Sequence, residues 1–323
     1  MILALILGSL RQTASGQATP SVAAYLSYLR DFPIIRKDRY GFNNDDTVYA
    51  YNNPYMLVGG SFFMGSCVHQ EDTVQAVMRR NGYPTVSTGF GGSGALAAVA
   101  ILKEYGETFR PPAVFLQFYD PNDIAVLKNR ELRSAFLLQY LRVGFTQHLI
   151  DRQPELDALW AKGHWNAAVN KFYNDPELKA SWERKLDINL PLVQELLGHD
   201  IKSLTEDDDL LLIFERILET AKRRLAAWGG RIYLVMIPNE GIYTMGTIPK
   251  YTRRVMSIMS KLGITVIDVD QALRAAGGPL QFHADPKGWS HLNAGGYFVM
   301  ARQMMQQVDH DFPASGPNSS GVE

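Results

Sequence analysis

The sequence predicts an α/β fold in which a mainly parallel, five-stranded sheet is covered by helices on both faces. Five short apolar runs have the length and the β-branched or aromatic content of buried parallel strands, and helical segments separate them. The expected strands are Tyr55–Val58, Pro84–Thr88, Ala113–Phe118, Ile232–Ile237 and Ile264–Val269.

The segments between these runs carry apolar residues at helical spacing. Such spacing indicates amphipathic helices that bury one side against the sheet. The expected helices are Asp72–Arg80, Ser93–Tyr105, Leu210–Trp228, Pro249–Leu262 and Ala294–Val308.

Between Ile124 and Ser203 the pattern is helical only and rich in aromatic residues. We therefore expect a helical insertion at about 124–203 that packs as a cap on one α/β domain spanning 39–310. Residues 314–323 are rich in Ser, Gly, Pro and Asn and are expected to form a flexible tail. No internal repeat is evident.

Composition bounds the class of protein. With 323 residues, 46% hydrophobic and 20% charged, the chain has the composition of a soluble globular protein. A net charge of -1 and a pI near 6.7 disfavour a nucleic-acid partner. The single cysteine, Cys67, cannot form an internal disulfide and leaves the redox compartment open.

The N-terminal segment, 1–38, is ambiguous. Ile2–Leu10 is an apolar run that is too short to span a bilayer and lacks the basic flank of a secretory signal. A weak or clipped signal and an ordinary packed segment both remain open.

Ser61 lies in the first of three polar loops that follow predicted strands. In the turn Gly59–Gly65 its hydroxyl would lie at a helix start, where backbone N–H groups favour a developing negative charge. A nucleophile fits this place, and so does a simple helix-capping serine.

The second loop, Gly89–Gly94, allows a backbone to approach a ligand closely. It also fits the G-x-G-x-x-G pattern, with a strand before it, a helix after it and Asp120 at the end of the next strand. A Rossmann-type dinucleotide-binding protein is therefore an alternative. That pattern does not account for Ser61, Asn122 and His291 on other strand-end loops.

Asn122, in the third loop, Tyr119–Asp123, could donate an amide hydrogen bond to an oxyanion or form an ordinary Asx turn. His291 is the only one of the seven histidines in a Gly/Ser/Asn loop that begins the last helix. A serine nucleophile needs such a base.

Taken in order, these four loops resemble the four sequence blocks of SGNH (GDSL-like) hydrolases. Gly59–Ser61 resembles the Gly-Asp-Ser block, Ser87–Gly94 the Asn-x-Gly-x-x-Gly block, Tyr119–Asp123 the Gly-x-Asn-Asp block and His291 the histidine of the Asp-x-x-His block. Met236–Tyr243 is similar to a connection in bacterial members linked to polysaccharide modification.

The resemblance implies a flavodoxin-like three-layer α/β/α sandwich and chemistry on ester-linked acyl groups without a metal or organic cofactor. It places the nucleophile at Ser61, its base at His291 and the oxyanion donors at Ser61, Gly92 and Asn122. The usual location of the family favours an extracytoplasmic protein, periplasmic or secreted, and a cytoplasmic location is left open.

Two positions depart from the family pattern. Gly60 stands in place of the aspartate beside the nucleophile, and Gly288 stands in place of the third triad member. Without a carboxylate on its far nitrogen, the imidazole is less well oriented. Asp285 is the nearest substitute, and a Ser/His dyad is the alternative.

We therefore expect a serine esterase or acyltransferase acting on acyl esters, in particular acetyl esters, of a small molecule or a polysaccharide. A non-catalytic carbohydrate-binding protein of the same fold remains a further alternative. No nucleic acid, cofactor or stable membrane insertion is expected.

Overall fold

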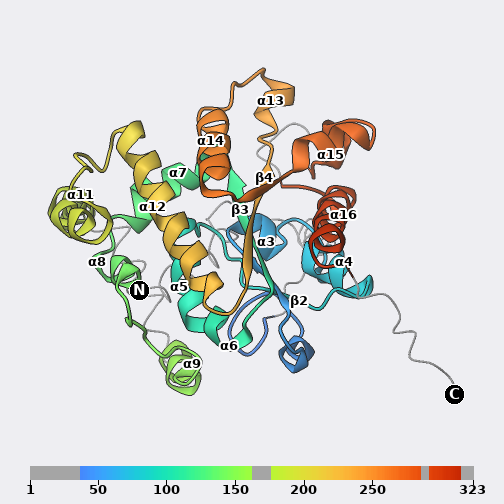
Figure 1. The fold of residues 1–323 in the computed structure, drawn as a ribbon, viewed down its shortest axis with the longest axis horizontal. Coiled ribbons are helices and arrows are strands. Elements are labelled where there is room, and N and C mark those ends of the chain that lie inside the picture. Colours follow the sequence, from blue (N-terminus) through green and yellow to red (C-terminus); the bar gives the residue numbers. More distant parts are fainter. Residues whose placement is uncertain (1–36, 162–175, 285–290, 314–323) are drawn as a thin grey trace, which may run out of the picture.

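The computed structural model describes residues 37–161, 176–284 and 291–313. The expected tail at 314–323 and nearly all of the segment 1–38 lie outside the described residues. Figure 1 shows a central sheet with helices on both sides.

The sheet has five strands in the order β2-β1-β3-β4-β5, and every pairing is parallel. The strands are β1 (Tyr55–Val58), β2 (Thr85–Ser87), β3 (Ala113–Tyr119), β4 (Arg231–Ile237) and β5 (Thr265–Asp268). All five expected strands are therefore confirmed to within two residues at each end. The order is that of flavodoxin-like doubly wound folds, as the resemblance implied.

The helices of the sheet domain follow the expected positions closely. Before the insertion they are η2 (Asp46–Ala50), α3 (Ser61–Met64), η3 (Gln70–Asp72), α4 (Val74–Arg80), α5 (Ala95–Ile101), η4 (Leu102–Gly106) and α6 (Glu107–Phe109). After it they are α12 (Asp207–Ala226), α13 (Gly241–Thr244), α14 (Thr252–Leu262), α15 (Val269–Ala275), η7 (Pro279–Phe282) and α16 (Ala294–Asp311).

Alternate residues of the central strands fill two separate cores. On β3, Val114 and Leu116 pack on the side of α5, α12 and α14, whereas Ala113 and Phe115 pack on the side of α4, α15 and α16. This period of two is what a parallel sheet covered on both faces requires. The result is the three-layer α/β/α arrangement expected from the sequence.

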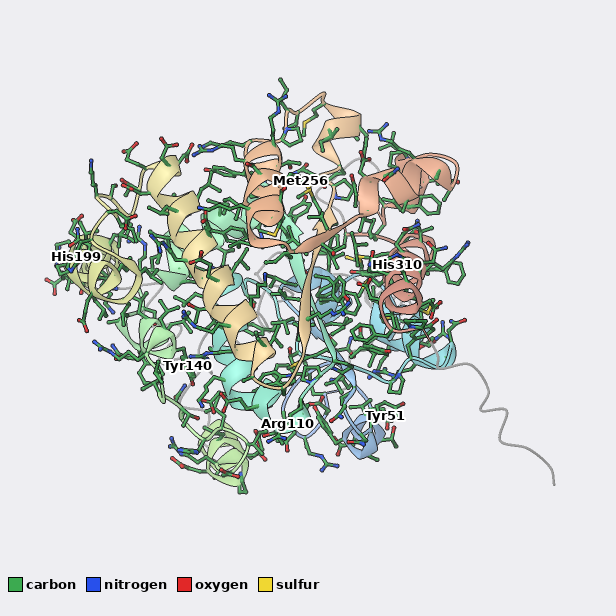
Figure 2. All side chains as sticks on the ribbon, in the orientation of Figure 1. Tyr51, Arg110, Tyr140, His199, Met256 and His310 are labelled. Atoms are coloured by element: carbon green, nitrogen blue, oxygen red, sulfur yellow. The ribbon has the colours of Figure 1, made fainter. Side chains whose placement is uncertain are left out.

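The described part of 124–203 contains helices and no strand. These are α7 (Asn122–Val126), η5 (Leu127–Glu131), α8 (Ala135–Leu138), η6 (Gln139–Leu141), α9 (Gln153–Ala161) and α11 (Pro176–Leu197). Tyr140, labelled in Figure 2, is buried in the core on the α5 side, and its ring packs at a right angle to that of Phe145. No helix among the described residues is long and apolar enough to cross a membrane.

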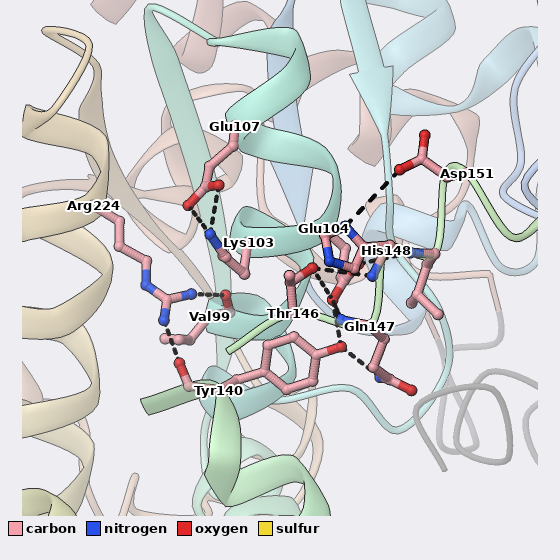
Figure 3. Close-up of polar contacts among 11 residues, drawn as sticks. Val99, Lys103, Glu104, Glu107, Tyr140, Thr146, Gln147, His148, Asp151 and Arg224 are labelled. Carbon is pink, nitrogen blue, oxygen red and sulfur yellow. Dashed lines mark hydrogen bonds and ion pairs between the residues drawn. The ribbon is translucent and has the colours of Figure 1, made fainter. Parts of the chain in front are cut away.

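A buried carboxylate, that of Glu104, ties this helical region to the sheet domain (Figure 3). It accepts hydrogen bonds from Tyr140 Oη at 2.7 Å, Gln147 N at 2.6 Å and Leu149 N at 2.8 Å. Arg224 on α12 adds hydrogen bonds to the carbonyl oxygens of Val99 and Tyr140. A single buried acid therefore satisfies several donors of the segment 140–149.

Glu104→Ala is expected to lower the free energy of unfolding by about 3 kcal/mol, because it leaves buried donors without an acceptor. Urea unfolding followed by circular dichroism measures this loss. Glu107→Ala is the matched control, since the Glu107 side chain is exposed and its ion pair with Lys103 should be worth less than about 1 kcal/mol. Equal losses in the two variants would contradict this assignment for Glu104.

Candidate active site

Three of the loops singled out in the sequence leave the carboxyl ends of β2, β1 and β3, which are adjacent in the sheet. The strand order reverses between β1 and β3. Ligands of open α/β sheets bind at the carboxyl edge at such a reversal. Ser61 follows β1 and Asn122 follows β3, so both residues flank this point.

The turn before Ser61 requires glycine at position 59, where φ is +156° and a Cβ would lie 2.5 Å from the Cβ of Gln117. A Cβ at Gly60 would lie 2.8 Å from Nε2 of Gln117, a buried side chain on β3. Gln117 Oε1 also accepts a hydrogen bond from Phe63 N at 3.3 Å. Gln117 therefore packs against both glycines of this turn, and at position 60 the contact is with the end of its flexible side chain.

Ser61 and His291 are in hydrogen-bond contact although 230 residues separate them: His291 Nε2 lies 2.7 Å from Ser61 Oγ. Ser61 is the first residue of α3, and His291 lies three residues before α16. A hydroxyl and an imidazole at this distance can exchange a proton directly.

The chain around His291 is fixed by short-range pairing. His283 and Leu292 form an antiparallel bridge, and Ala284 N donates to His291 O at 2.9 Å. Asn293 caps α16 by accepting a hydrogen bond from Gly296 N at 3.1 Å. The polar residues after the histidine thus define where the last helix begins and where the imidazole lies.

Two side chains from the α3 region contact the imidazole. The ring of Phe62 lies 4.7 Å from that of His291, centroid to centroid. The Cys67 Sγ lies 3.7 Å from His291 Nδ1. In the described part of the chain it is therefore a thiol that lies beside the ring nitrogen to which a triad carboxylate would bond.

Burial lowers the pKa of His291 below the usual 6.5, and the Glu240 carboxylate partly opposes this by stabilising the charged ring. Glu240 is itself buried, in the loop after β4, and accepts a hydrogen bond from Tyr119 Oη at 2.8 Å. The neutral imidazole, which is the form that accepts a proton, is therefore favoured at neutral pH.

The loop after β3 is held by two buried acids. Asp120 Oδ2 accepts hydrogen bonds from Tyr251 N and Thr252 N, both at 2.7 Å, at the start of α14. Burial raises the pKa of Asp123 to about 8, so this carboxyl is mostly neutral at pH 7. Asn122 is exposed at the start of α7, and its side chain hydrogen-bonds to the Asp123 carboxyl.

The glycine-rich loop ends on a helix start that is already occupied by an acid. Glu131, fully buried, accepts hydrogen bonds from Gly94 N at 2.9 Å, Leu96 N at 3.0 Å and Ala97 N at 2.9 Å. These are the donors that a dinucleotide pyrophosphate would need. The G-x-G-x-x-G match is therefore explained by a structural carboxylate, which disfavours the Rossmann alternative.

The structure thus brings Ser61 and His291 together and places Gly92 and Asn122 on loops at the same edge of the sheet. The roles of Ser61, Gly92 and Asn122 as oxyanion donors remain predictions. Asp285, the expected substitute for the triad aspartate, lies outside the described residues, as does Gly288.

Sequence reasoning assigned no role to four residues of this region. Phe62 and Cys67 contact the imidazole, and Tyr119 is hydrogen-bonded to Glu240. Glu240 could have been found, because it follows a predicted strand and must reach the same carboxyl edge. Cys67 lies six positions after Ser61, and no sequence pattern relates it to a histidine more than two hundred residues away.

No protein-family model and no curated protein matches the chain. Solved structures do. One is a Bacillus subtilis protein, with 13% identity and a TM-score of 0.42. The match covers 82% of this chain and 58% of the Bacillus protein, so this chain spans less than two thirds of that protein's length. Another is a GDSL-like lipase from Bacteroides thetaiotaomicron, with 13% identity and a TM-score of 0.42 over 82% and 95% of the two chains.

A third solved structure is a two-domain esterase active on acetylated mannans, with 13% identity and a TM-score of 0.39 over 86% of this chain and 54% of that one. At these levels of similarity, what this chain does has to be inferred from its own residues.

The acidic limb of the pH profile of kcat/KM should have its midpoint below pH 6.5. His291 must be neutral to accept a proton, and burial lowers its pKa, so activity should persist below the usual histidine range and be lost only as His291 becomes protonated. Hydrolysis of a short aryl ester, followed between pH 4 and 8, measures this midpoint.

Glu240→Gln should move the same midpoint further down, because the carboxylate that favours charged His291 is removed. Tyr119→Phe is the control, since it removes the hydrogen bond to Glu240 but keeps the charge. A midpoint that is unchanged in Glu240→Gln, or that rises, would contradict the electrostatic role of Glu240.

Proposed function

We propose that this chain is a serine esterase or acyltransferase that cleaves acyl esters through a covalent Ser61 intermediate. The observation that carries the proposal is the 2.7 Å contact between Ser61 Oγ and His291 Nε2 at the carboxyl edge of the sheet. A serine and a histidine with purely structural roles would not have to be hydrogen-bonded to each other at this edge.

The first step is attack on the ester carbonyl. Ser61 Oγ forms a bond to the carbonyl carbon while its proton passes to His291 Nε2, and the carbonyl oxygen becomes an oxyanion. The backbone N–H groups of Ser61 and Gly92 and the Asn122 amide are the donors that we assign to it. The alcohol then leaves with the proton from His291, and an acyl-Ser61 remains.

The second step repeats this chemistry with a new nucleophile. His291 takes a proton from water or from an acceptor hydroxyl, whose oxygen bonds to the acyl carbon, and Ser61 Oγ leaves with that proton. Water gives an esterase and a sugar hydroxyl gives a transferase. We propose acetyl as the acyl group and a carbohydrate as its carrier, following the family resemblance.

The orientation of the imidazole is the part of the mechanism in which this chain departs from a full triad. The ring nitrogens lie beside Ser61 Oγ and Cys67 Sγ, and the ring also contacts that of Phe62. Glu240 supplies negative charge nearby. A dyad supported in this way, or a triad completed by Asp285, would each serve. The Asp285→Asn variant distinguishes them, because only a triad loses orders of magnitude in kcat.

Ser61→Ala and His291→Ala should each lower kcat for phenyl acetate at least about 10³-fold, because nucleophile and base act as a unit. Ser66→Ala is the matched control, since Ser66 contacts Tyr297 through its carbonyl oxygen rather than its side chain. A folded Ser61→Ala variant with undiminished activity would rule out the proposal. A wild-type protein that binds acetylated glycans without cleaving them would favour the non-catalytic alternative.

A further inference from the structure

Arg130 lies directly against the glycine to which we assign an oxyanion donor. Gly92 has a φ of +75°, a conformation that L side chains rarely adopt. A Cβ built there would lie 2.0 Å from Arg130 Nη1. The guanidinium therefore takes the place of a side chain at position 92 and lies over the Cα of this glycine.

The end of η5 presents two opposite charges to the same loop. Glu131 is buried and is satisfied by the N–H groups of Gly94, Leu96 and Ala97. Arg130 is half-buried, contributes a favourable charge to Glu131 and forms no ion pair within the described part of the chain. A guanidinium stays charged at any physiological pH and readily binds oxyanions.

The loop that carries Gly92 touches the turn that carries the nucleophile. Phe90 N donates to Gly59 O at 3.0 Å, and a Cβ at Gly60 would lie 3.4 Å from Ser93 O. A substrate carbonyl bound between Ser61 and Gly92 would therefore have Arg130 next to it. Both Gly92 and Arg130 are partly exposed, so a ligand can reach them.

We propose that Arg130 binds an anionic group of the substrate, so that the ester on which this site acts carries a carboxylate, phosphate or sulfate close to the acyl group. This inference rests on the proposed esterase function and narrows its substrate class. Arg130 is then a specificity-determining residue. Its planar pair of N–H groups suits two oxygens of one oxyanion.

The anion could belong to the acyl group or to the alcohol, and two matched pairs of esters distinguish these sources. In the first pair, phenyl hemisuccinate carries a carboxylate on the acyl group and phenyl butyrate is its neutral counterpart. In the second pair, 3-acetoxybenzoate, the acetate ester of 3-hydroxybenzoate, carries the carboxylate on the alcohol side, and phenyl acetate is its neutral counterpart. Values of kcat/KM for all four esters, at low and high salt, give the preference of the wild-type protein and of each variant.

The wild-type protein should prefer the anionic member of at least one pair by about tenfold or more, and salt should weaken the preference. Arg130→Gln should abolish it while changing the neutral esters less than about threefold, and Arg130→Lys should keep part of it. Lys128→Gln removes the same charge from the same turn, but Lys128 points to Thr205 O, so the preference should persist.

Absence of any preference in the wild-type protein, or a preference that survives Arg130→Gln, would overturn the assignment. So would an equal loss on all four esters, which would make Arg130 a general support of the loop. Calorimetric binding of phenyl hemisuccinate and 3-acetoxybenzoate to Ser61→Ala, with and without Arg130→Gln, tests the anion site without turnover. Tighter binding that depends on Arg130 supports the site even if the esterase proposal fails, and equal binding refutes it.

Discussion

The parallel pairing of β1 with β3 is the constraint on which the candidate site depends. Leu57 pairs with Phe115 and Val58 with Leu116, so both strands end at the same edge with β2 on one side and β4 on the other. The loops that leave this edge therefore lie in the same region of the surface. Ser61, Gly92, Asn122 and Glu240 each follow one of these four strands.

The fold was largely predictable because burial on both faces gives strands a simple pattern. β1 is a continuous apolar run and β3 is interrupted only by Gln117. Turn residues follow both strands, and their positions were predicted to within a residue. The position of His291 followed from its loop before the last helix. A strand-end rule could have pointed to Glu240, which follows β4. It could not have pointed to Cys67, because no sequence pattern relates that residue to His291.

The glycine-rich loop shows how one sequence pattern can arise from two physical causes. Glycines in this loop are compatible with a bound pyrophosphate and equally with a close contact to another part of the protein. The sequence left these two alternatives open. In the structure the N–H groups at the start of α5 are bonded to protein, because the Glu131 carboxylate accepts three hydrogen bonds there. That carboxylate lies more than thirty residues away in a helix, so periodicity and composition gave no sign of it.

The central claim is that Ser61 is a nucleophile activated by His291. Labelling of the folded protein with an alkyl fluorophosphonate, followed by peptide mass mapping, tests it most directly. The account predicts a single covalent adduct on Ser61 that forms readily in the wild-type protein and not in His291→Ala. Equal labelling of both proteins, or an adduct only on another residue, would contradict it.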